Sequence, residues 1–435
     1  MGTLIILGGF LLQILSFGAV GQTALAKDRI EKTSHKWPQW RGPNRDGCSK
    51  ETDLIETFPK SGPEVLWRVE IGSGYSGIAV VDEYLYTMYS EGDHEFALCL
   101  DVEAGLEVWR FTTDKIYLNQ HGSGPRSTPT VDDDRVYLLS AKGKLYALRA
   151  SDKKRIWQID LRESFRTGIP KYGFATSPMI EKDLLIMEIG DVSGNSVVAF
   201  NKYDGTVVWR TGTHVLNHNH GLEYLKDQPG YSSPIAVTSH GYRQIIIFTA
   251  SQLIAVSPTG DLVWGVPWVT RNGANVMAPI FLANNRIFIS SGYNKGASLW
   301  QINTSGGKLH VDEVWRNKVM RNEFSSAVYH DGYIYGFDKG SLKCVDAADG
   351  KQKWKKTGIG RGNLIYADGQ LIVLGERGKL LLVQASEKGY REKAKAKIVK
   401  KGKCWTPPSL ANGRLFIRNQ FEIICVNLKK CRENL

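Results

Sequence analysis

Long apolar runs are almost missing from this chain of 435 residues. One such run occupies residues 3–20, and the small-x-small sequence Ala24-Leu25-Ala26 and the charged Lys27 follow it. This order predicts a cleaved secretory signal peptide at residues 1–26. An uncleaved N-terminal anchor is the alternative, because the run is long enough to span a bilayer and no Lys or Arg precedes it. We therefore expect a periplasmic or secreted protein with no membrane span after signal cleavage.

Catalytic motifs are missing as well. The chain has no G-x-S-x-G elbow, no glycine-rich phosphate loop ahead of a helix and no C-x-x-C-H sequence for haem attachment. His214, His218 and His220 lie in one long loop without a zinc-site spacing, so we interpret them as hydrogen-bonded loop residues rather than metal ligands. We predict no catalytic residue and no metal site. The net charge of +12 comes with no nucleic-acid-binding motif, so no specific nucleic-acid partner is expected.

A repeat runs through the chain instead. Each copy begins with small residues, often as Ser-x-Pro or Ser-Pro, continues as two β-rich runs around an Asp- or Asn-containing turn, and ends in a Gly-containing turn and a Trp. Successive copies begin near residues 77, 129, 178, 234, 279, 326, 363 and 407, between about 37 and about 56 residues apart. This is the period of a four-stranded propeller blade. The sequence therefore predicts an all-β, eight-bladed β-propeller with four-stranded blades.

One tryptophan ends nearly every repeat. An indole ring that recurs once per blade is suited to cover the contact between neighbouring sheets and to donate a hydrogen bond from its ring nitrogen. We interpret the following residues as structural: Trp67, Trp109, Trp157, Trp209, Trp264, Trp315 and Trp354.

The six cysteines are scattered, and no two are adjacent. Cys99, Cys344 and Cys425 stand at a repeat position that Ala fills in other blades, so we expect them in the blade cores. Cys48, Cys404 and Cys431 lie outside this position. Cys404 begins the last blade and Cys431 follows its final strand, so a disulfide between them is possible, but spacing alone does not fix the connectivity.

The two ends of the repeat array complement each other. Residues 64–69 form a Trp-containing strand with no blade before it, and the last repeat, residues 406–428, stops before its Trp strand. Pairing the two removes two exposed sheet edges, so the N-terminal strand is predicted to close a propeller of residues 64–431. The Pro- and Gly-rich residues 27–63 are predicted to form an N-terminal arm on the outside of the propeller.

The repeat resembles a known family. The A-x-D-x-x-x-G-x-x-x-W blade endings and S-x-P starts are similar to those of the pyrroloquinoline-quinone (PQQ) repeat propellers, which include quinoprotein dehydrogenases and BamB-like propellers. The segments WPQWRGPNRDG, HGSGPRSTPTV, YGFATSP and GYSSP resemble a periplasmic BamB-like group common in Planctomycetes and related bacteria. The resemblance covers about residues 37–428, and it implies the fold rather than an activity, because this ring occurs in enzymes and in adaptors.

The same resemblance bears on cofactors. Dehydrogenases of the family carry an adjacent pair of cysteines beneath the quinone, an acid-rich calcium site and a catalytic Asp. This chain has no adjacent cysteines, and none of its loops combines Asp, Glu and Asn oxygens as a calcium site requires. We therefore expect neither PQQ nor calcium, and no other cofactor is predicted.

Ligands of propellers usually bind where loops of successive blades meet at the mouth of the channel. Here these loops are basic and aromatic, and the candidate ligand-binding residues are His121, Arg126, Tyr172, His218, His220, Arg271, Arg321, Glu323, Arg361 and Trp405. Because Arg stays charged, a ring of inward-facing arginines would need acidic partners or an anion. We predict an anionic or polyhydroxylated ligand. The alternative is that each Arg is satisfied by carbonyls of its own loop or faces water.

These features favour one function over another. We expect a monomeric binding or scaffolding propeller that contacts a protein or an envelope ligand without catalysis. The alternative is a quinoprotein-type oxidoreductase with its site at the channel mouth.

Overall fold

The structure is a computed structural model that describes residue 1 and residues 35–191, 195–212, 229–270 and 273–430. The chain divides into two units, residues 1–33 and residues 34–435, and the second contains all the strands. The predicted signal peptide lies, apart from Met1, outside the described residues and stays a prediction. Across the described ranges, no helix is both long enough and apolar enough to cross a membrane.

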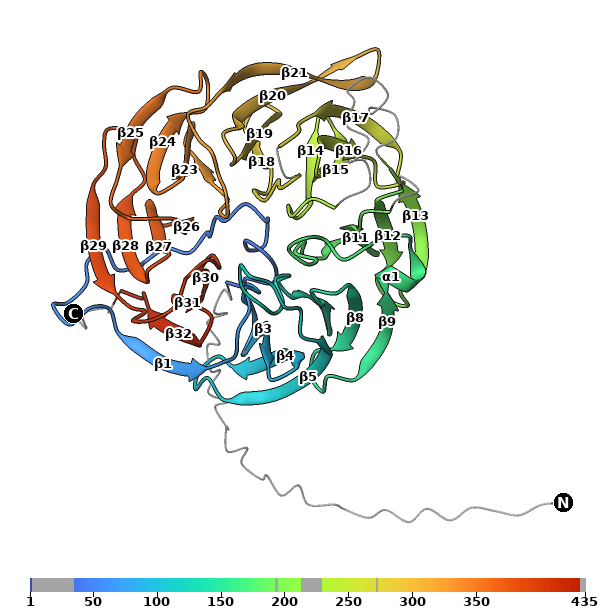
Figure 1. Ribbon diagram of the computed structural model, residues 1–435, viewed down its shortest axis with the longest axis horizontal. Coiled ribbons are helices and arrows are strands. Elements are labelled where there is room, and N and C mark those ends of the chain that lie inside the picture. The colour runs from blue at the N-terminus through green and yellow to red at the C-terminus, as the bar shows by residue number, and fades with distance from the viewer. Residues whose placement is uncertain (2–34, 192–194, 213–228, 271–272, 431–435) are drawn as a thin grey trace. The chain divides into compact units, whose positions relative to one another are not determined.

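Eight four-stranded antiparallel sheets follow one another around a ring (Figure 1). The first four blades are β2 (Ala79–Val81), β3 (Tyr84–Glu91), β4 (His94–Asp101) and β5 (Glu107–Lys115); β6 (Thr130–Asp132), β7 (Arg135–Leu139), β8 (Lys144–Arg149) and β9 (Arg155–Asp160); β10 (Met179–Glu181), β11 (Leu184–Glu188), β12 (Val197–Asn201) and β13 (Val207–Thr211); and β14 (Ile235–Ser239), β15 (Tyr242–Phe248), β16 (Gln252–Val256) and β17 (Leu262–Pro267). A short helix, α1 (Leu161–Ser164), follows β9.

The next three blades are β18 (Ile280–Leu282), β19 (Arg286–Ser291), β20 (Gly296–Ser305) and β21 (Lys308–Asn317); β22 (Val328–His330), β23 (Tyr333–Asp338), β24 (Ser341–Asp346) and β25 (Gln352–Lys356); and β26 (Gly362–Ala367), β27 (Gln370–Gly375), β28 (Lys379–Gln384) and β29 (Glu392–Lys397). The eighth blade combines both ends of the array: β1 (Val65–Glu70), β30 (Ser409–Ala411), β31 (Arg414–Arg418) and β32 (Glu422–Asn427). These sheets confirm the predicted eight-bladed all-β propeller.

The N-terminal strand closes the ring as predicted. β1 pairs antiparallel with β32, and Trp67 lies opposite Cys425. Arg418 of β31 strengthens this seam, because its guanidinium donates hydrogen bonds to the carbonyl oxygens of Ser76 and Met88 in the first blade. The Arg418 side chain is almost fully buried and has no carboxylate partner among the described residues, and this burial lowers its pKa.

The structural tryptophans connect neighbouring blades as predicted. Six of the seven donate the indole N–H to a backbone carbonyl of the next blade, over 2.7–3.1 Å: Trp67 to Val102, Trp109 to Ala150, Trp157 to Lys202, Trp209 to Pro258, Trp315 to Ala347 and Trp354 to Ser386. Trp264 differs, because it donates to Gln244 Oε1 of its own blade. The seventh blade has no such Trp, and there Ala394 lies opposite the bulkier Leu382.

In four blades, the glycine before the Trp strand has a reason in this contact, because it lies against the Trp of the preceding blade. A Cβ on Gly205 would lie 2.9 Å from the Trp157 ring of the preceding blade, and Gly205 has a φ of +78°. Gly260 meets Trp209 in the same way. In these blades the Gly and the Trp of one repeat make contacts on opposite sides. The Gly packs against the Trp of the preceding blade, and the Trp packs against the next blade.

The cysteines of the repeat position lie in the blade cores. Cys99 is opposite Trp109 and Cys344 is opposite Trp354, both fully buried. Cys404 is buried and forms no disulfide with another described cysteine, and Cys431 lies outside the described residues, so the possible disulfide between them stays open.

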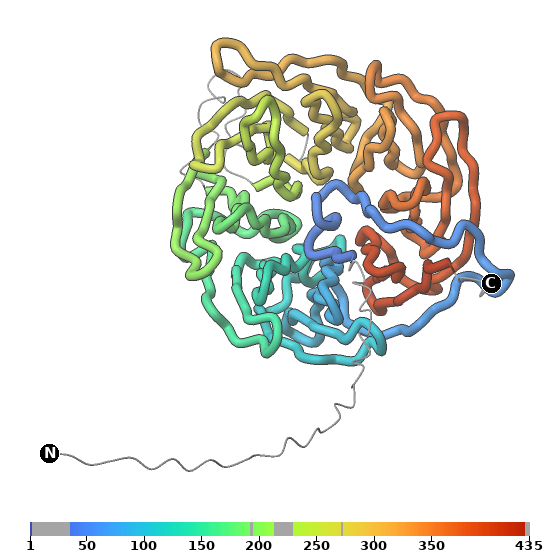
Figure 2. Tube along the Cα trace, turned by 180° about the vertical axis from the view of Figure 1, so that it is seen from behind, coloured from blue at the N-terminus to red at the C-terminus, as the bar shows by residue number. Residues whose placement is uncertain are grey.

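The prediction that the arm packs on the outside of the propeller is wrong for residues 37–47, which lie in the centre of the ring (Figure 1). The buried guanidinium of Arg45 donates to the carbonyl oxygens of Ser177 and Pro178 over 3.0 and 2.9 Å, and that of Arg41 donates to Ala327. These carbonyls flank innermost strands, whose free edges need hydrogen-bond partners. Beyond residue 47 the arm runs outward to the rim (Figure 2).

Candidate functional site

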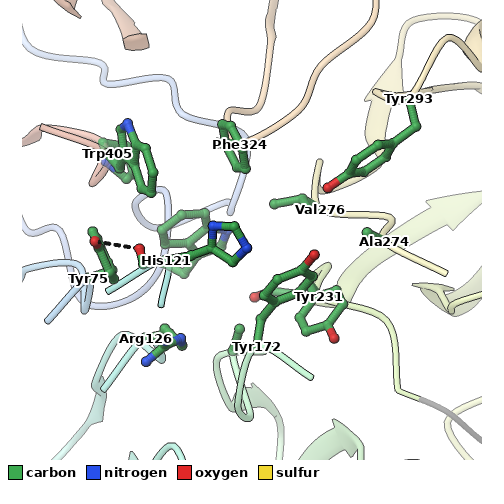
Figure 3. Close-up of a pocket in the computed structure, with 14 residues that line it drawn as sticks. Tyr75, His121, Arg126, Tyr172, Tyr231, Ala274, Val276, Tyr293, Phe324 and Trp405 are labelled. Atoms are coloured by element: carbon green, nitrogen blue, oxygen red, sulfur yellow. Dashed lines mark hydrogen bonds between the residues drawn. The ribbon is translucent and has the colours of Figure 1, made fainter. Parts of the chain in front are cut away.

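A cavity with a volume of about 230 Å³ opens where the blades converge. It is lined mainly by the segments that lead into seven of the eight innermost strands. Tyr293, between β19 and β20, and Trp40, from the arm, also line it. The described lining residues are Trp40, Tyr75, His121, Arg126, Tyr172, Ala175, Tyr231, Ser233, Ala274, Val276, Tyr293, Phe324, Trp405 and Pro407, most of them labelled in Figure 3. We call this cavity the mouth pocket.

The pocket wall consists mainly of aromatic rings that support one another. Trp405 stacks on Phe324 with ring centroids 5.1 Å apart and on Tyr75 at 5.5 Å. On the other side of the pocket, Tyr172 makes edge contacts with Tyr231 at 5.4 Å and with His121 at 5.6 Å. The rings therefore form two groups that face a common space (Figure 3), and the wall is preorganised by ring contacts across different blades.

Hydrogen bonds fix the polar ends of this wall. The Tyr75 hydroxyl donates to the carbonyl oxygen of His121 over 2.9 Å and accepts from the side-chain amide of Gln420 over 2.6 Å. The first of these bonds is drawn in Figure 3. Tyr75 thereby joins the loops of the first, second and eighth blades.

Arg126 is the one permanently charged side chain among the described residues that line the pocket. Its guanidinium donates to the carbonyl oxygens of Gly122 and Gly124 in its own loop and lies over the rings of Tyr117, at 4.9 Å, and Tyr75, at 5.8 Å. Burial lowers the pKa of Arg126. Within the described part of the chain, no carboxylate lies within ion-pair distance of Arg126. Buried Glu95, whose pKa burial raises to about 7, acts on Arg126 only through space, so no ion pair compensates the positive charge of the pocket.

Two buried glutamates hold the loops behind the wall. Glu95 accepts hydrogen bonds from the backbone N–H groups of Tyr117 and Ala141, and burial raises its pKa to about 7. Glu188, at the end of β11, accepts one from Gly230, next to the pocket residue Tyr231, and burial raises its pKa to about 8. Both side chains are fully buried, so they position loops rather than meet a ligand.

The structure brings together some of the predicted site residues. His121, Arg126, Tyr172 and Trp405 line the mouth pocket. Glu323 and Arg361 form an ion pair at 3.0 Å beside a small adjoining pocket, which Trp405 also lines. Arg321 makes a two-pronged contact with Asp338, over 2.7 and 2.9 Å, and does not line the mouth pocket. The candidates that lie outside the described residues are His218, His220 and Arg271.

Sequence analysis missed Trp40, Tyr231, Tyr293 and Phe324. A positional signal exists for two of them, because the pocket takes one side chain from a fixed place, four residues before the innermost strand begins. This place holds Tyr75, Arg126, Ala175, Tyr231, Val276, Phe324 and Trp405 in seven blades. Trp40 has no such signal, because it belongs to the arm.

The donor set of the pocket does not fit a quinone held through calcium. Calcium prefers six to eight oxygen ligands, mainly from carboxylates, amides and carbonyls. The described lining residues contribute hydroxyl groups of Tyr and Ser but no carboxylate and no side-chain amide, and no cysteine.

The fold and the pocket together define a class, the eight-bladed propeller with a ligand-sized pocket at its central mouth. The family model described as outer membrane protein assembly factor BamB matches residues 93–356, and the chain belongs to this family. It is 23% identical to BamB of Moranella endobia over 77% of this chain and 84% of that protein. It is 22% identical to BamB of Yersinia pestis over 71% and 76%, respectively.

Solved structures share the fold at low identity. BamB from Moraxella catarrhalis superposes with a TM-score of 0.60 and 13% identity over 85% of this chain and 99% of that chain. The quinohemoprotein alcohol dehydrogenase from Comamonas testosteroni superposes with a TM-score of 0.60 and 12% identity over 92% and 81%. An assembly factor and an enzyme therefore resemble this ring equally well, and the ring alone does not decide between the two functions.

Proposed function

We propose that this chain is a binding and scaffolding propeller of the cell envelope and that its mouth pocket binds an anionic, polyhydroxylated ligand without catalysis. The observation that carries the proposal is the aromatic wall with Arg126 as its uncompensated charge. Aromatic faces pack against the flat apolar faces of a ligand, while tyrosine hydroxyls and a guanidinium supply directed hydrogen bonds. An anion at this place would give Arg126 the negative partner that its loop lacks.

The family supports the scaffolding part of this proposal. The family is described as an outer membrane protein assembly factor, and the named relatives carry the same name. This favours a protein partner and a location in the envelope for this chain too. Both agree with the exported adaptor predicted from the sequence. The eight blades give such an adaptor a rigid frame, because the same tryptophan contact ties the blades together at six seams.

The oxidoreductase alternative is supported by the shared ring alone. The pocket lacks the oxygen donors for calcium among its described residues, and the described cysteines lie elsewhere. We therefore propose that the chain works without PQQ and calcium. Dye-linked oxidation of alcohols or sugars that depends on both additions would contradict this.

Arg126 offers a direct test of the pocket. Oligogalacturonate serves as an acidic, polyhydroxylated probe, and calorimetry measures its affinity for the full chain. We expect Arg126→Gln to lower the affinity about 10-fold or more, because a charge-assisted hydrogen bond is lost, and Arg126→Lys to retain part of it. Trp405→Leu should also weaken binding, since it removes a stacking surface.

Arg149→Gln is the matched control. Arg149 lies in the same blade and pairs with Asp152 at the surface, away from the pocket, so its loss should leave the affinity unchanged. If the probe does not bind, or binds equally well to the Arg126→Gln protein, Arg126 is a satisfied structural residue and the ligand part of the proposal fails.

A further inference from the structure

A second surface stands out by its charge. Six basic residues gather where β27 turns into β28 and where β29 leaves the seventh blade: Arg377, Lys379, Lys397, Lys400, Lys401 and Lys403. All six side chains are exposed. We call this cluster the basic face.

Contacts place these segments side by side. Lys379 and Lys397 are direct cross-strand partners, and the Lys397 ammonium group donates to the carbonyl oxygen of Arg377. The backbone N–H groups of Ile398 and Val399 donate to the carbonyl oxygen of Gly378. The chain then continues directly into residues 400–403, so the six charges belong to one surface.

Folding alone does not account for this arrangement. Like charges directly opposite each other on adjacent strands destabilise a sheet, and here Lys379 faces Lys397. Across the described residues, no carboxylate lies within ion-pair distance of any of the six. The nearby acids have other partners, since Glu422 pairs with Arg68 and Glu376 accepts from the Trp405 indole. The positive charge is therefore available to an outside partner.

An exposed aromatic ring stands beside these charges. The Phe421 side chain is 56% exposed, and it packs against Gly402, between Lys401 and Lys403. The amide of Asn419 fixes this contact by donating to the carbonyl oxygen of Lys401 over 2.6 Å. An exposed Phe among lysines suits a lipid surface, because the ring can enter the interface while the lysines contact phosphates.

We infer that the basic face and Phe421 dock this propeller on an anionic lipid bilayer. Five of the six charged residues are lysines, which act as point charges, whereas arginine can bind a single carboxylate through two hydrogen bonds. Point charges suit a diffuse array of lipid headgroups. Phe421 adds a shallow apolar contact. The inference is independent of the ligand proposed for the mouth pocket.

Sedimentation with vesicles tests this docking. The full chain is mixed with vesicles of phosphatidylglycerol and phosphatidylcholine, and with vesicles of phosphatidylcholine alone, which report any contribution of the apolar N-terminal run. We expect binding to the anionic vesicles to exceed binding to the neutral ones and to weaken as salt is raised. Absence of this preference at low salt would overturn the inference.

Two sets of variants locate the surface. Replacing Lys379, Lys397, Lys400 and Lys401 by Gln should lower the affinity for anionic vesicles by about 10²-fold, because each lysine near a charged bilayer contributes separately. The control carries the same change at four exposed lysines of other blades: Lys154, Lys182, Lys308 and Lys318. We expect the control to bind as the unmodified chain does. An equal loss of affinity in both variants would show that binding depends on net charge alone, and it would overturn the inference that the basic face is the docking surface.

Phe421 separates a bilayer from other anions. Phe421→Ala should lower vesicle binding about 10-fold, Phe421→Leu should retain most of it, and Tyr242→Ala, at a 48% exposed aromatic residue of the fourth blade, should have no effect. Thermal unfolding checks that each variant keeps its fold. Capture of polyglutamate through the four lysines, without vesicle binding, would show a face for acidic polypeptides and would overturn the bilayer.

Discussion

The seams between the blades and the centre of the ring are built in different ways. At the seams one device recurs, in which an indole N–H donates to a carbonyl of the next blade and the ring meets a glycine there. In the centre, Arg41, Arg45 and Trp40 of the arm make contacts that occur once each. The residues that form the seam contact therefore recur along the sequence, whereas the residues that fill the centre occur only once. Loss of one seam contact leaves its copies in place, whereas the arm has no substitute.

Two truncations separate these regions with the largest expected effects. Removing residues 1–70 deletes β1, leaves β32 with an unpaired edge and should cause aggregation and loss of cooperative unfolding. Removing residues 1–63 deletes the arm but keeps β1, and this ring should stay monomeric while losing about 3 kcal/mol or more of stability, because buried Trp37 and the bonds of Arg45 are lost.

Size-exclusion chromatography and thermal unfolding measure both effects, with the chain starting at His35 as the control. A monomeric, cooperatively folding protein without residues 1–70 would show that closure by β1 is dispensable. Equal behaviour of the two truncated chains would show that the arm, rather than the strand, holds the ring together.

The same contrast explains what the sequence can predict. The fold followed from it because nearly every blade repeats the turn, the small residue and the Trp, so the pairing of the N-terminal strand with the last blade could be inferred from a missing and an extra strand. The arm could not be placed, because the lack of periodicity in WPQWRGPNRDG shows that it is not a strand and says nothing about where it packs. Its buried arginines satisfy carbonyls that become visible only once the inner strands are assembled.

The mouth pocket lies between these two cases. His121, Arg126, Tyr172 and Trp405 were predicted to be at the mouth from their place in the blade-connecting loops, and they line the pocket. Which arginines would be paired with acidic side chains was harder to predict. Such ion pairs join residues far apart in the sequence, and only the folded chain brings them together. Arg321 meets Asp338 from the end of β23, and Arg361 meets Glu323 from another blade.

A pair of glycine substitutions sharpens the comparison at one seam. Gly205→Ala should destabilise the protein by about 2–4 kcal/mol, because it adds backbone strain at a φ of +78° and a methyl group 2.9 Å from the Trp157 ring. Gly241→Ala has a similar φ of +80° but nothing within 4 Å, so it should cost about 1 kcal/mol. Urea unfolding measures both. Equal costs would show that the seam tolerates the methyl group and that backbone strain is the whole effect.

The smallest expected effect concerns pH. Burial raises the pKa of Glu188 to about 8, well above the ordinary value of 4.5, so the folded state holds this proton more tightly than the unfolded state does. Its contribution to stability is then fully present below about pH 4.5 and is lost as the pH rises through about 8, with a slope of at most about 1.4 kcal/mol per pH unit. Glu95, with its pKa raised to about 7, adds a slope of the same sign.

Glu188→Gln should remove the larger part of this slope, because the neutral amide keeps an oxygen for the Gly230 N–H and has no proton to lose. The variant should equal the unmodified chain near pH 4.5 and be more stable than it near pH 6.5, by about 1–3 kcal/mol. Urea unfolding across this range measures the difference. Glu181→Gln is the control, since this carboxylate pairs with Arg243 and its replacement leaves Glu188 and the slope due to it in place. If the slopes with and without Glu188 coincide, the glutamate is ionised in the folded protein, and an unseen partner holds its second oxygen, which the described residues leave without a hydrogen bond.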